Sequence, residues 1–429
     1  MVANYKERIS DTGKFWFPLD NAAKIFPAIL NKEMTTVMRL TVVLKEPVNI
    51  KALFKAAGDV EKRFPYFKVQ LKEGFFWYYL EHQPLRFPVE VDNKPPCRKF
   101  SGHGLLCRIM VAGNRISVEF SHIITDGSGA FEFLKTLLSR YAEELNADIP
   151  PEFNYLKPGD PIAEQEFEDS YQRYFREDIP PMVSKSRAFH LPWALRLRPR
   201  FSRLNLIVGM PGMKTLARQH GVSVNDFLVS AYMAVLQEIY EEMSNPGRYK
   251  HIRVQVPINL RKIFPSETMR NFSLFVMPEL DMRLGHYTFD EIIKSVYHQI
   301  RLETDKKLIN KNISRNVGGE KKIYVKSIPL FLKSMILRMK YYSLGTAQYS
   351  GVVTNLGKAK FPAQVEQLVD YFIFTPPPPN KVLKLSCGII GFNDKVVLSF
   401  SSIMKSEKFE AKFLQFLHKR GITAYFDNH

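Results

Sequence analysis

Residues 115–121 alternate between apolar and polar side chains, which is the pattern of a half-buried β-strand. A second strand-like run covers 105–111, and Gly113 and Asn114 between the two runs are typical of a tight hairpin turn. Beyond this strand, apolar side chains recur at helical spacing, at Ala130, Phe131, Leu134, Leu137, Leu138 and Tyr141. The sequence therefore predicts a hairpin followed by a helix, with His122 where the second strand ends.

His122 is a candidate for proton transfer. A side chain at the end of a rigid strand is held firmly and can still point into a cleft. Histidine is the side chain best able to take and return a proton near neutral pH. Asp126 follows four residues later and has three open roles: it could orient the turn, cap the next helix at Ser128, or pair with a distant arginine. Gly127 and Gly129 allow a sharp turn and a close approach to a ligand.

Residues 122–127 resemble the H-x-x-x-D-G signature of the CoA-dependent acyltransferase superfamily. Its members include non-ribosomal peptide condensation domains, wax-ester synthases, alcohol acetyltransferases and chloramphenicol acetyltransferase. The run Leu19-Asp20-x-x-Ala23 resembles the N-terminus of bacterial alcohol-acetyltransferase-like members. The signature has only three fixed letters, so a strand-end histidine satisfied by backbone groups is the alternative.

The resemblance implies an α/β fold with mixed, α+β-like sheets. It implies two chloramphenicol-acetyltransferase-like domains that form a V, with the active-site channel between them. Ser121 departs from the family pattern, because many members carry a first histidine there. That position is usually structural in the family, so catalysis is not excluded, but a peptide condensation domain is disfavoured.

Composition places a boundary before the middle of the chain. Residues 147–182 are rich in proline and acidic side chains, which indicates an extended crossing segment with one helix over 163–176. We therefore expect an N-terminal acyltransferase-like domain with the histidine motif at 1–160. A crossing linker is expected at 161–200, and a C-terminal acyltransferase-like domain at 201–429.

Local patterns predict most of the other elements. Strands are expected at 36–44, 67–71, 75–80, 204–209, 253–258, 349–354, 382–390 and 396–402. Asn49, Ser223 and Thr288 are expected N-caps of helices, and Thr288 has capping-box spacing to Glu291. Two further helices are expected at 213–219, ended by Gly221, and at about 407–419.

Residues 256–261 continue from a predicted strand and end in Arg261, and Asn271 lies ten residues further on. Alone, this is a strand, a loop and a solvated arginine. The resemblance implies that Arg261 pairs with the motif aspartate, and it makes Asn271 a substrate-binding candidate. Since a buried carboxylate needs a cation, Asp126 is expected to hold the loop of the catalytic motif (His122, Asp126, Gly127) rather than to polarise the histidine.

The element Thr354-Asn355-x-Gly357 ends another predicted strand. It resembles an element of alcohol acetyltransferases that faces the catalytic histidine. Thr354 or Asn355 is therefore a candidate donor to an acyl carbonyl, as is the backbone N–H of Gly127. The alternative is an ordinary β-turn in which Asn and Gly take left-handed conformations.

The formal net charge of +18 indicates an anionic partner: nucleotide phosphates, an acidic carrier protein, a membrane face or nucleic acid. Residues 301–340 hold eleven Lys and Arg against three acidic residues, and form either a solvated face or an approach surface for phosphate or a carrier protein. The run 328–342 mixes large apolar and basic residues, and could lie on a membrane, cover an acyl channel or form a buried helix. No recognised nucleic-acid module is present, so no specific nucleic-acid binding is expected.

The sequence contains no P-loop, no G-x-G-x-x-G and no Gly-x-Ser-x-Gly elbow, and its three cysteines lack metal-ligand spacing. No metal and no bound cofactor are expected. The resemblance implies acyl-CoA or an acyl carrier protein as donor and a small alcohol or amine as acceptor. The first residues lack a signal peptide's apolar core, and no apolar run approaches the roughly 18 residues of a spanning helix, so a cytoplasmic location is expected.

The function that the resemblance implies is an acyltransferase that moves an acyl group from an acyl thioester to an alcohol or amine, with His122 as general base. The alternative is a non-catalytic, condensation-like protein that binds a lipid, a carrier protein or another anionic partner.

Overall fold

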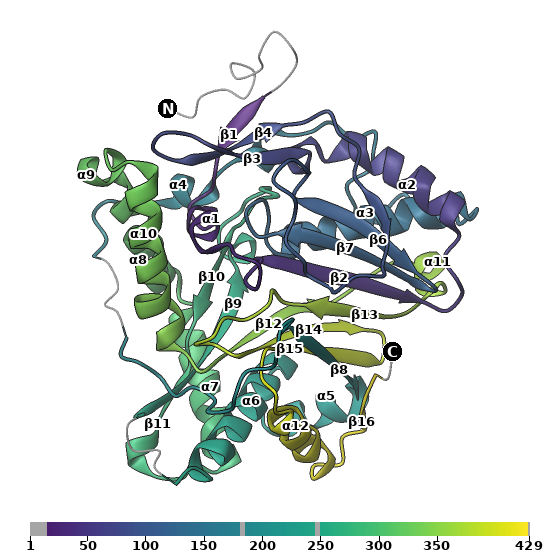
Figure 1. Ribbon diagram of the computed structural model, residues 1–429. Helices are drawn as coiled ribbons and strands as arrows, with labels where there is room; N and C mark the ends of the chain where they lie inside the picture. The colour runs from purple at the N-terminus through teal and green to yellow at the C-terminus, as the bar shows by residue number, and fades with distance from the viewer. Residues whose placement is uncertain (1–14, 181–184, 245–248, 428–429) are drawn as a thin grey trace.

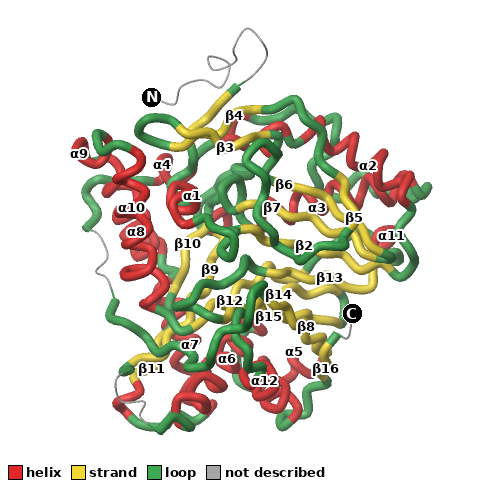
Figure 2. The backbone as a smooth tube through the Cα atoms, viewed as in Figure 1, coloured by secondary structure: helices red, strands yellow, loops and turns green. Residues whose placement is uncertain are grey.

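The computed structural model describes residues 15–180, 185–244 and 249–427. The chain forms a five-stranded and an eight-stranded sheet, each packed against helices, and a small three-stranded sheet at one end (Figure 1, Figure 2). The five-stranded sheet has its main apolar core against helices of the first half of the chain, and the eight-stranded sheet has a separate core with helices of the second half.

The five-stranded sheet has the order β13-β2-β7-β6-β5. Its strands are β13 (Val369–Thr375), β2 (Val37–Leu44), β7 (Arg115–Ser121), β6 (Cys107–Ala112) and β5 (Val89–Val91). Helices α2 (Ile50–Arg63) and α3 (Gly127–Glu144) bury their apolar faces in the core of this sheet. The predicted hairpin and the helix after it are confirmed. So is the cap at Asn49, whose Oδ1 accepts a hydrogen bond from Ala52 N at 3.1 Å.

Strand β13 comes from the second half of the chain, yet it pairs antiparallel with β2. No strand at this position was predicted from the sequence. The second half thus supplies an edge strand to the sheet that carries His122.

The eight-stranded sheet has the order β10-β9-β12-β14-β15-β8-β16, and β11 also pairs with β9. Its strands are β8 (Ser202–Gly209), β9 (His251–Asn259), β10 (Ser273–Val276), β11 (Glu279–Asp281), β12 (Gly351–Lys358), β14 (Leu385–Phe392), β15 (Lys395–Ser402) and β16 (Ala424–Phe426). Its helices are α5 (Met210–Gln219), α6 (Val224–Glu241), α7 (Phe289–Glu303) and α12 (Lys408–His418). The predicted N-caps at Ser223 and Thr288 are confirmed, each as part of a capping box.

Six shorter or peripheral helices complete the described part of the chain. They are α1 (Phe26–Ile29), α4 (Ser170–Tyr174), α8 (Lys306–Lys321), α9 (Ile323–Lys326), α10 (Leu330–Lys340) and α11 (Ala363–Glu366). The three-stranded sheet consists of β1 (Trp16–Pro18), β4 (Tyr78–His82) and β3 (Val69–Glu73). Across the described ranges, no helix has both the length and the apolarity needed to cross a membrane.

Three predicted elements differ from the structure. The helix predicted over 163–176 is wrong: a short 3₁₀ helix, Glu164–Phe167, and α4 replace it. The break occurs because the Glu166 carboxylate turns inward and accepts hydrogen bonds from buried Arg63 and Tyr66. The strand predicted at 75–80 begins only at Tyr78, and the strand predicted to end at Thr354 continues past a bulge to Lys358.

Candidate active site

His122 follows directly after β7, as the sequence predicts. Its backbone N–H donates to the carbonyl oxygen of Thr36, and its own carbonyl oxygen accepts from Asn271 Nδ2, each at 2.9 Å. Its imidazole ring is half-buried, with the ring of Phe26 from α1 5.5 Å away between centroids. Because both backbone groups are bonded, the main chain that carries the ring is fixed.

The electrostatic surroundings favour a neutral His122. Burial lowers the pKa of the imidazole and outweighs the nearby Asp126 carboxylate and the Asn271 and Thr125 hydrogen bonds, which raise it. The pKa therefore lies below its ordinary value of 6.5. At neutral pH the ring is an acceptor for a proton, which is the state that a general base needs.

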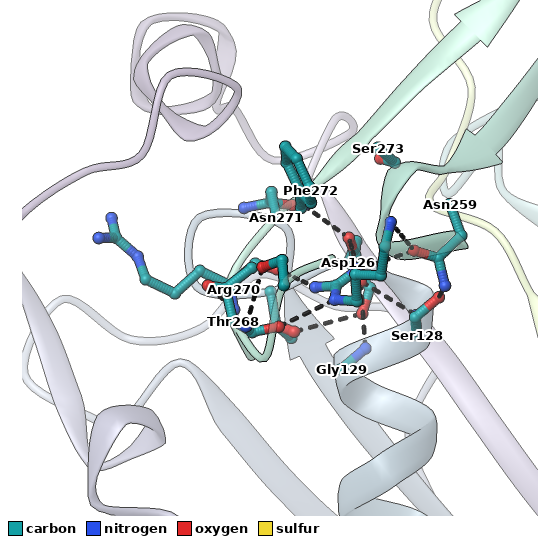
Figure 3. A network of polar contacts seen from close by, with 12 residues as sticks. Asp126, Ser128, Gly129, Asn259, Thr268, Arg270, Asn271, Phe272 and Ser273 are labelled. Atoms are coloured by element: carbon teal, nitrogen blue, oxygen red, sulfur yellow. Dashed lines mark hydrogen bonds and ion pairs between the residues drawn. The ribbon is translucent and has the colours of Figure 1, made fainter. Parts of the chain in front are cut away.

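Asp126 begins helix α3 and closes the loop after His122 (Figure 3). Its Oδ1 accepts from the backbone N–H groups of Ser128 and Gly129, both at 3.1 Å. Its Oδ2 accepts from Arg261 Nη1 at 2.9 Å and from Phe272 N at 2.8 Å. Of the three roles left open by the sequence, the carboxylate thus has two at once: it caps the helix and pairs with a distant arginine.

The four donors also set the protonation state of Asp126. Burial alone would raise the pKa of this carboxyl group, but the Arg261 guanidinium and the hydrogen bonds from Phe272 and Gly129 outweigh burial and lower it. Asp126 is therefore ionised at neutral pH and only 4% exposed. A buried charge with this many donors serves to hold a loop in place.

The guanidinium of Arg261 is held as firmly as the carboxylate that it meets. Its Nε donates to Thr268 O at 2.9 Å and its Nη2 donates to Arg270 O. Asn259 Oδ1 accepts from Arg261 N at 3.0 Å. These contacts use both edges of the planar group, so its orientation toward Asp126 is fixed.

Asn271 links the loop to the start of the chain. Besides the His122 carbonyl, its Nδ2 donates to Asp20 Oδ2 at 3.0 Å. Asp20 is fully buried, accepts from Ala23 N at 2.8 Å, and lies 3.7 Å from Arg270 Nε. The sequence predicted substrate binding for Asn271 and no role for Asp20. The Leu19-Asp20 run was the sequence feature from which a role for Asp20 could have been predicted.

Three further contacts clamp the loop and were not predicted. Thr125 Oγ1 donates to Met269 O at 2.7 Å, and Asn259 Nδ2 donates to Ser128 Oγ at 3.0 Å. A Cβ on Gly129 would lie 2.5 Å from Met269 O, closer than real contacts allow. Glycine at 129 is therefore required by the close approach of α3 to the segment 259–272.

The element at 354–357 also comes next to the loop. A Cβ built on Gly127 would meet the side chain of Leu356 at 2.8 Å. Asn355 Oδ1 accepts from Gly357 N at 2.8 Å, and Asn355 Nδ2 donates to Asn225 Oδ1 at 3.2 Å. The Asn355 amide thus bonds to its own turn through its oxygen and to α6 through its nitrogen, while Thr354 lies half-buried in β12.

A cavity of about 390 Å³ is lined in part by Arg261 of the ion pair. Its walls include Ser128, Lys135, Asn259, Arg261 and Thr268. His122 is not among the residues that line this cavity.

Comparison with known proteins gives different results for sequence and structure. No protein-family model matches the sequence, and no curated protein does. The fold is similar to a trichothecene 15-O-acetyltransferase from Fusarium sporotrichioides, with TM-score 0.63 and 9% identity, covering 96% of both chains. It is also similar to F. graminearum TRI101, solved with coenzyme A and deoxynivalenol, with TM-score 0.63 and 11% identity over 96% of this chain and 99% of that one.

A third similar structure is the starter condensation domain of rhizomide synthetase, with TM-score 0.56 and 12% identity over 95% of this chain and 96% of that one. At these identities the likeness concerns the fold, and it agrees with the mixed α/β class predicted from the sequence. The protein therefore has the two-domain, mixed α/β fold of the CoA-dependent acyltransferases and condensation domains.

Proposed function

We propose that the protein transfers an acyl group from an acyl thioester to the hydroxyl or amine of a small acceptor, with His122 as general base. The proposal is supported chiefly by the surroundings of His122 in the structure. Its ring is half-buried, its pKa is lowered by burial, and both of its backbone polar groups are hydrogen-bonded. A neutral imidazole on a fixed backbone suits proton transfer at neutral pH.

The reaction follows from these properties. The neutral ring of His122 takes the proton of the acceptor hydroxyl or amine as that group's oxygen or nitrogen attacks the thioester carbonyl. The tetrahedral intermediate then collapses, the carbon–sulfur bond breaks, and the leaving thiolate takes the proton from the imidazolium. Acyl product and free thiol result, with no covalent acyl-enzyme.

Two groups are proposed to support the developing negative charge on the carbonyl oxygen. One is the backbone N–H of Gly127, at the start of α3, where helix amides favour negative charge. The other is the hydroxyl of Thr354, which we prefer to Asn355 because the Asn355 nitrogen already donates to Asn225 of α6.

We propose acyl-CoA as the donor, with an acyl carrier protein as the alternative. One similar structure was solved with coenzyme A and deoxynivalenol, and a variant starter condensation domain with C8-CoA and Leu-SNAC. The net charge of +18 suits the phosphates of either donor. CoA is then a substrate rather than a resident cofactor.

The test measures free thiol released from a panel of acyl-CoAs, with and without alcohols and amines, and identifies products by mass spectrometry. His122→Ala should lower turnover by about 10²–10⁴-fold with the fold retained by circular dichroism. His298→Ala, which changes an exposed histidine on α7, is the matched control and should keep full turnover.

A fully active His122→Ala protein would refute the assignment of the base. If the parent protein cleaves no thioester with any acceptor of the panel, the acyl-transfer proposal is wrong. The alternative hypothesis, a non-catalytic binding protein, is then favoured.

A further inference from the structure

Helix α10 turns large apolar side chains toward solvent. Its exposed apolar residues follow one helical face, namely Phe331, Leu332, Met335, Ile336 and Met339. Phe331 is 71% exposed and Met339 65%, whereas the basic Lys333 on the opposite face is 3% exposed. The sequence left a buried helix open as an alternative for this run, and these exposures exclude it. Single exposed apolar residues are normal on a protein surface, but a contiguous row marks an interaction site.

The exposed row continues onto the loop between β3 and β4. Phe75 is 73% exposed and Phe76 43%. Both lie beside α10, because Leu330 N donates to Phe75 O at 3.0 Å and Lys333 Nζ donates to Phe76 O at 2.9 Å. Figure 1 shows α10 at the periphery, next to the end of this hairpin. We call the seven residues the apolar ridge: Phe75, Phe76, Phe331, Leu332, Met335, Ile336 and Met339.

The underside of α10 is fixed to the body of the protein. The buried Lys333 ammonium lies 3.7 Å from the centre of the Trp77 ring. The same ammonium donates a hydrogen bond to Phe76 O. Arg338 Nε donates to Ala28 O at 2.9 Å, which ties α10 to α1. The helix is thus held with its apolar face outward, and the exposure is a property of the folded protein.

Basic side chains outnumber acidic ones around the ridge, although the exposed Glu73 lies two residues from Phe75. Residues 321–345 contain six Lys and Arg and no acidic residue. Arg338 and Lys340 are exposed on α10 itself and flank its apolar row, while Lys321 of α8 and Lys326 of α9 are exposed in the same basic segment. Apolar side chains flanked by Lys and Arg are the composition of helices that lie in the headgroup region of a bilayer. An anionic lipid surface can bind both the apolar row and the basic residues beside it. A second copy of this chain, which also carries a net charge of +18, would bring like charges together.

We propose that the apolar ridge and its basic flanks bind the surface of a lipid bilayer that contains anionic lipids. The apolar side chains enter the headgroup region, and the lysines and arginines contact lipid phosphates. The ridge also lies near the candidate active site: α10 packs on α1, and Phe26 of α1 lies against the His122 ring. Vesicle binding needs no catalysis, so this proposal and the proposed function can fail separately.

The experiment measures co-sedimentation of the full chain with vesicles of phosphatidylcholine alone and of phosphatidylcholine mixed with phosphatidylglycerol. Binding should require the anionic lipid and should weaken, without vanishing, as salt is raised. Phe331→Glu with Met335→Glu should lower vesicle affinity at least about tenfold, because two apolar anchors are replaced by charges that anionic lipids repel. Phe54→Glu with Leu284→Glu is the matched control, since both residues are exposed apolar side chains outside the ridge.

Each result decides the proposal. Loss of binding in the ridge variant, with binding kept in the control, supports it. Equal binding by both variants would show that net charge alone attracts the protein, and absence of binding to mixed vesicles would overturn the proposal directly. If light scattering shows a dimer of the parent protein that the ridge variant cannot form, the ridge is an interface between copies, and the proposal is wrong.

Discussion

Arg261→Met removes the cation from the Asp126 carboxylate and keeps a side chain of similar length. The carboxylate is 4% exposed and would keep three donors, the N–H groups of Ser128, Gly129 and Phe272. Removing one partner of a buried ion pair costs about 3–5 kcal/mol. Because three backbone donors still stabilise the charge, we expect the lower end, a loss of about 3 kcal/mol in the free energy of unfolding.

Arg261→Lys should recover about half of this loss. It restores a positive charge near Asp126, but a lysine cannot also reach the carbonyl oxygens of Thr268 and Arg270 that the guanidinium contacts. The measurement is urea unfolding followed by circular dichroism, with stability taken from the midpoint and the slope. An Arg261→Met protein that unfolds at the midpoint of the parent would refute the reasoning.

The pH dependence of the difference between parent and Arg261→Met is a second check. The folded-state pKa of Asp126 is lowered from 3.8, so the stability contributed by its ionised form is fully present above that value and is lost as pH falls through the lower, folded-state pKa. Loss of Arg261 raises the pKa of Asp126 in the variant, so the difference should shrink as pH falls from that value to the lower pKa in the parent. A difference that keeps its full size into strong acid would assign the effect to another group.

Three other expectations concern the same loop. The value of kcat/KM for thioester cleavage should rise with pH through a midpoint below 6.5 and then level off, because the neutral form of His122 is the active one and its pKa is lowered; a midpoint above 7 would contradict this. Asn271→Ala frees the His122 carbonyl and should lower kcat about 10²-fold, checked by steady-state kinetics beside a thermal melt. Gly129→Ala should destabilise the protein by about 1–3 kcal/mol through the clash with Met269 O, whereas Gly58→Ala, with open space on α2, should stabilise it by about 0.5–1 kcal/mol in the same urea assay.

Local patterns in the sequence were sufficient for the segment around His122. The alternation over 115–121, the hairpin turn and the helical spacing after it depend on neighbouring residues only, so they predict β6, β7 and α3 correctly. The caps at Asn49, Ser223 and Thr288 are equally local. Arg261 was named as the partner of Asp126 only through the family resemblance, because no local pattern joins residues 135 positions apart.

The features that sequence reasoning missed depend on contacts distant in the chain. Strand β13 is placed by pairing with β2, and nothing within 369–375 identifies that partner. The helix expected over 163–176 has suitable residues, but burial of Glu166 against Arg63 breaks it. Asp20 and Asn271 lie 251 residues apart and meet only after both halves have folded. Tertiary contacts override local preference at each of these positions.

The placement of β13 decides how far the two halves of the protein can move. One edge of β13 pairs with β2, and its side chains Tyr371 and Ile373 share a buried cluster with Ile207 of β8 and Val397 of β15. Separating the sheets would break either the strand pairing or this cluster. The backbone of His122, held by Asn271 from the second half, is therefore in position before any substrate binds. A site arranged in advance avoids reorganisation during a reaction, which is the property that the proposed general-base role of His122 requires.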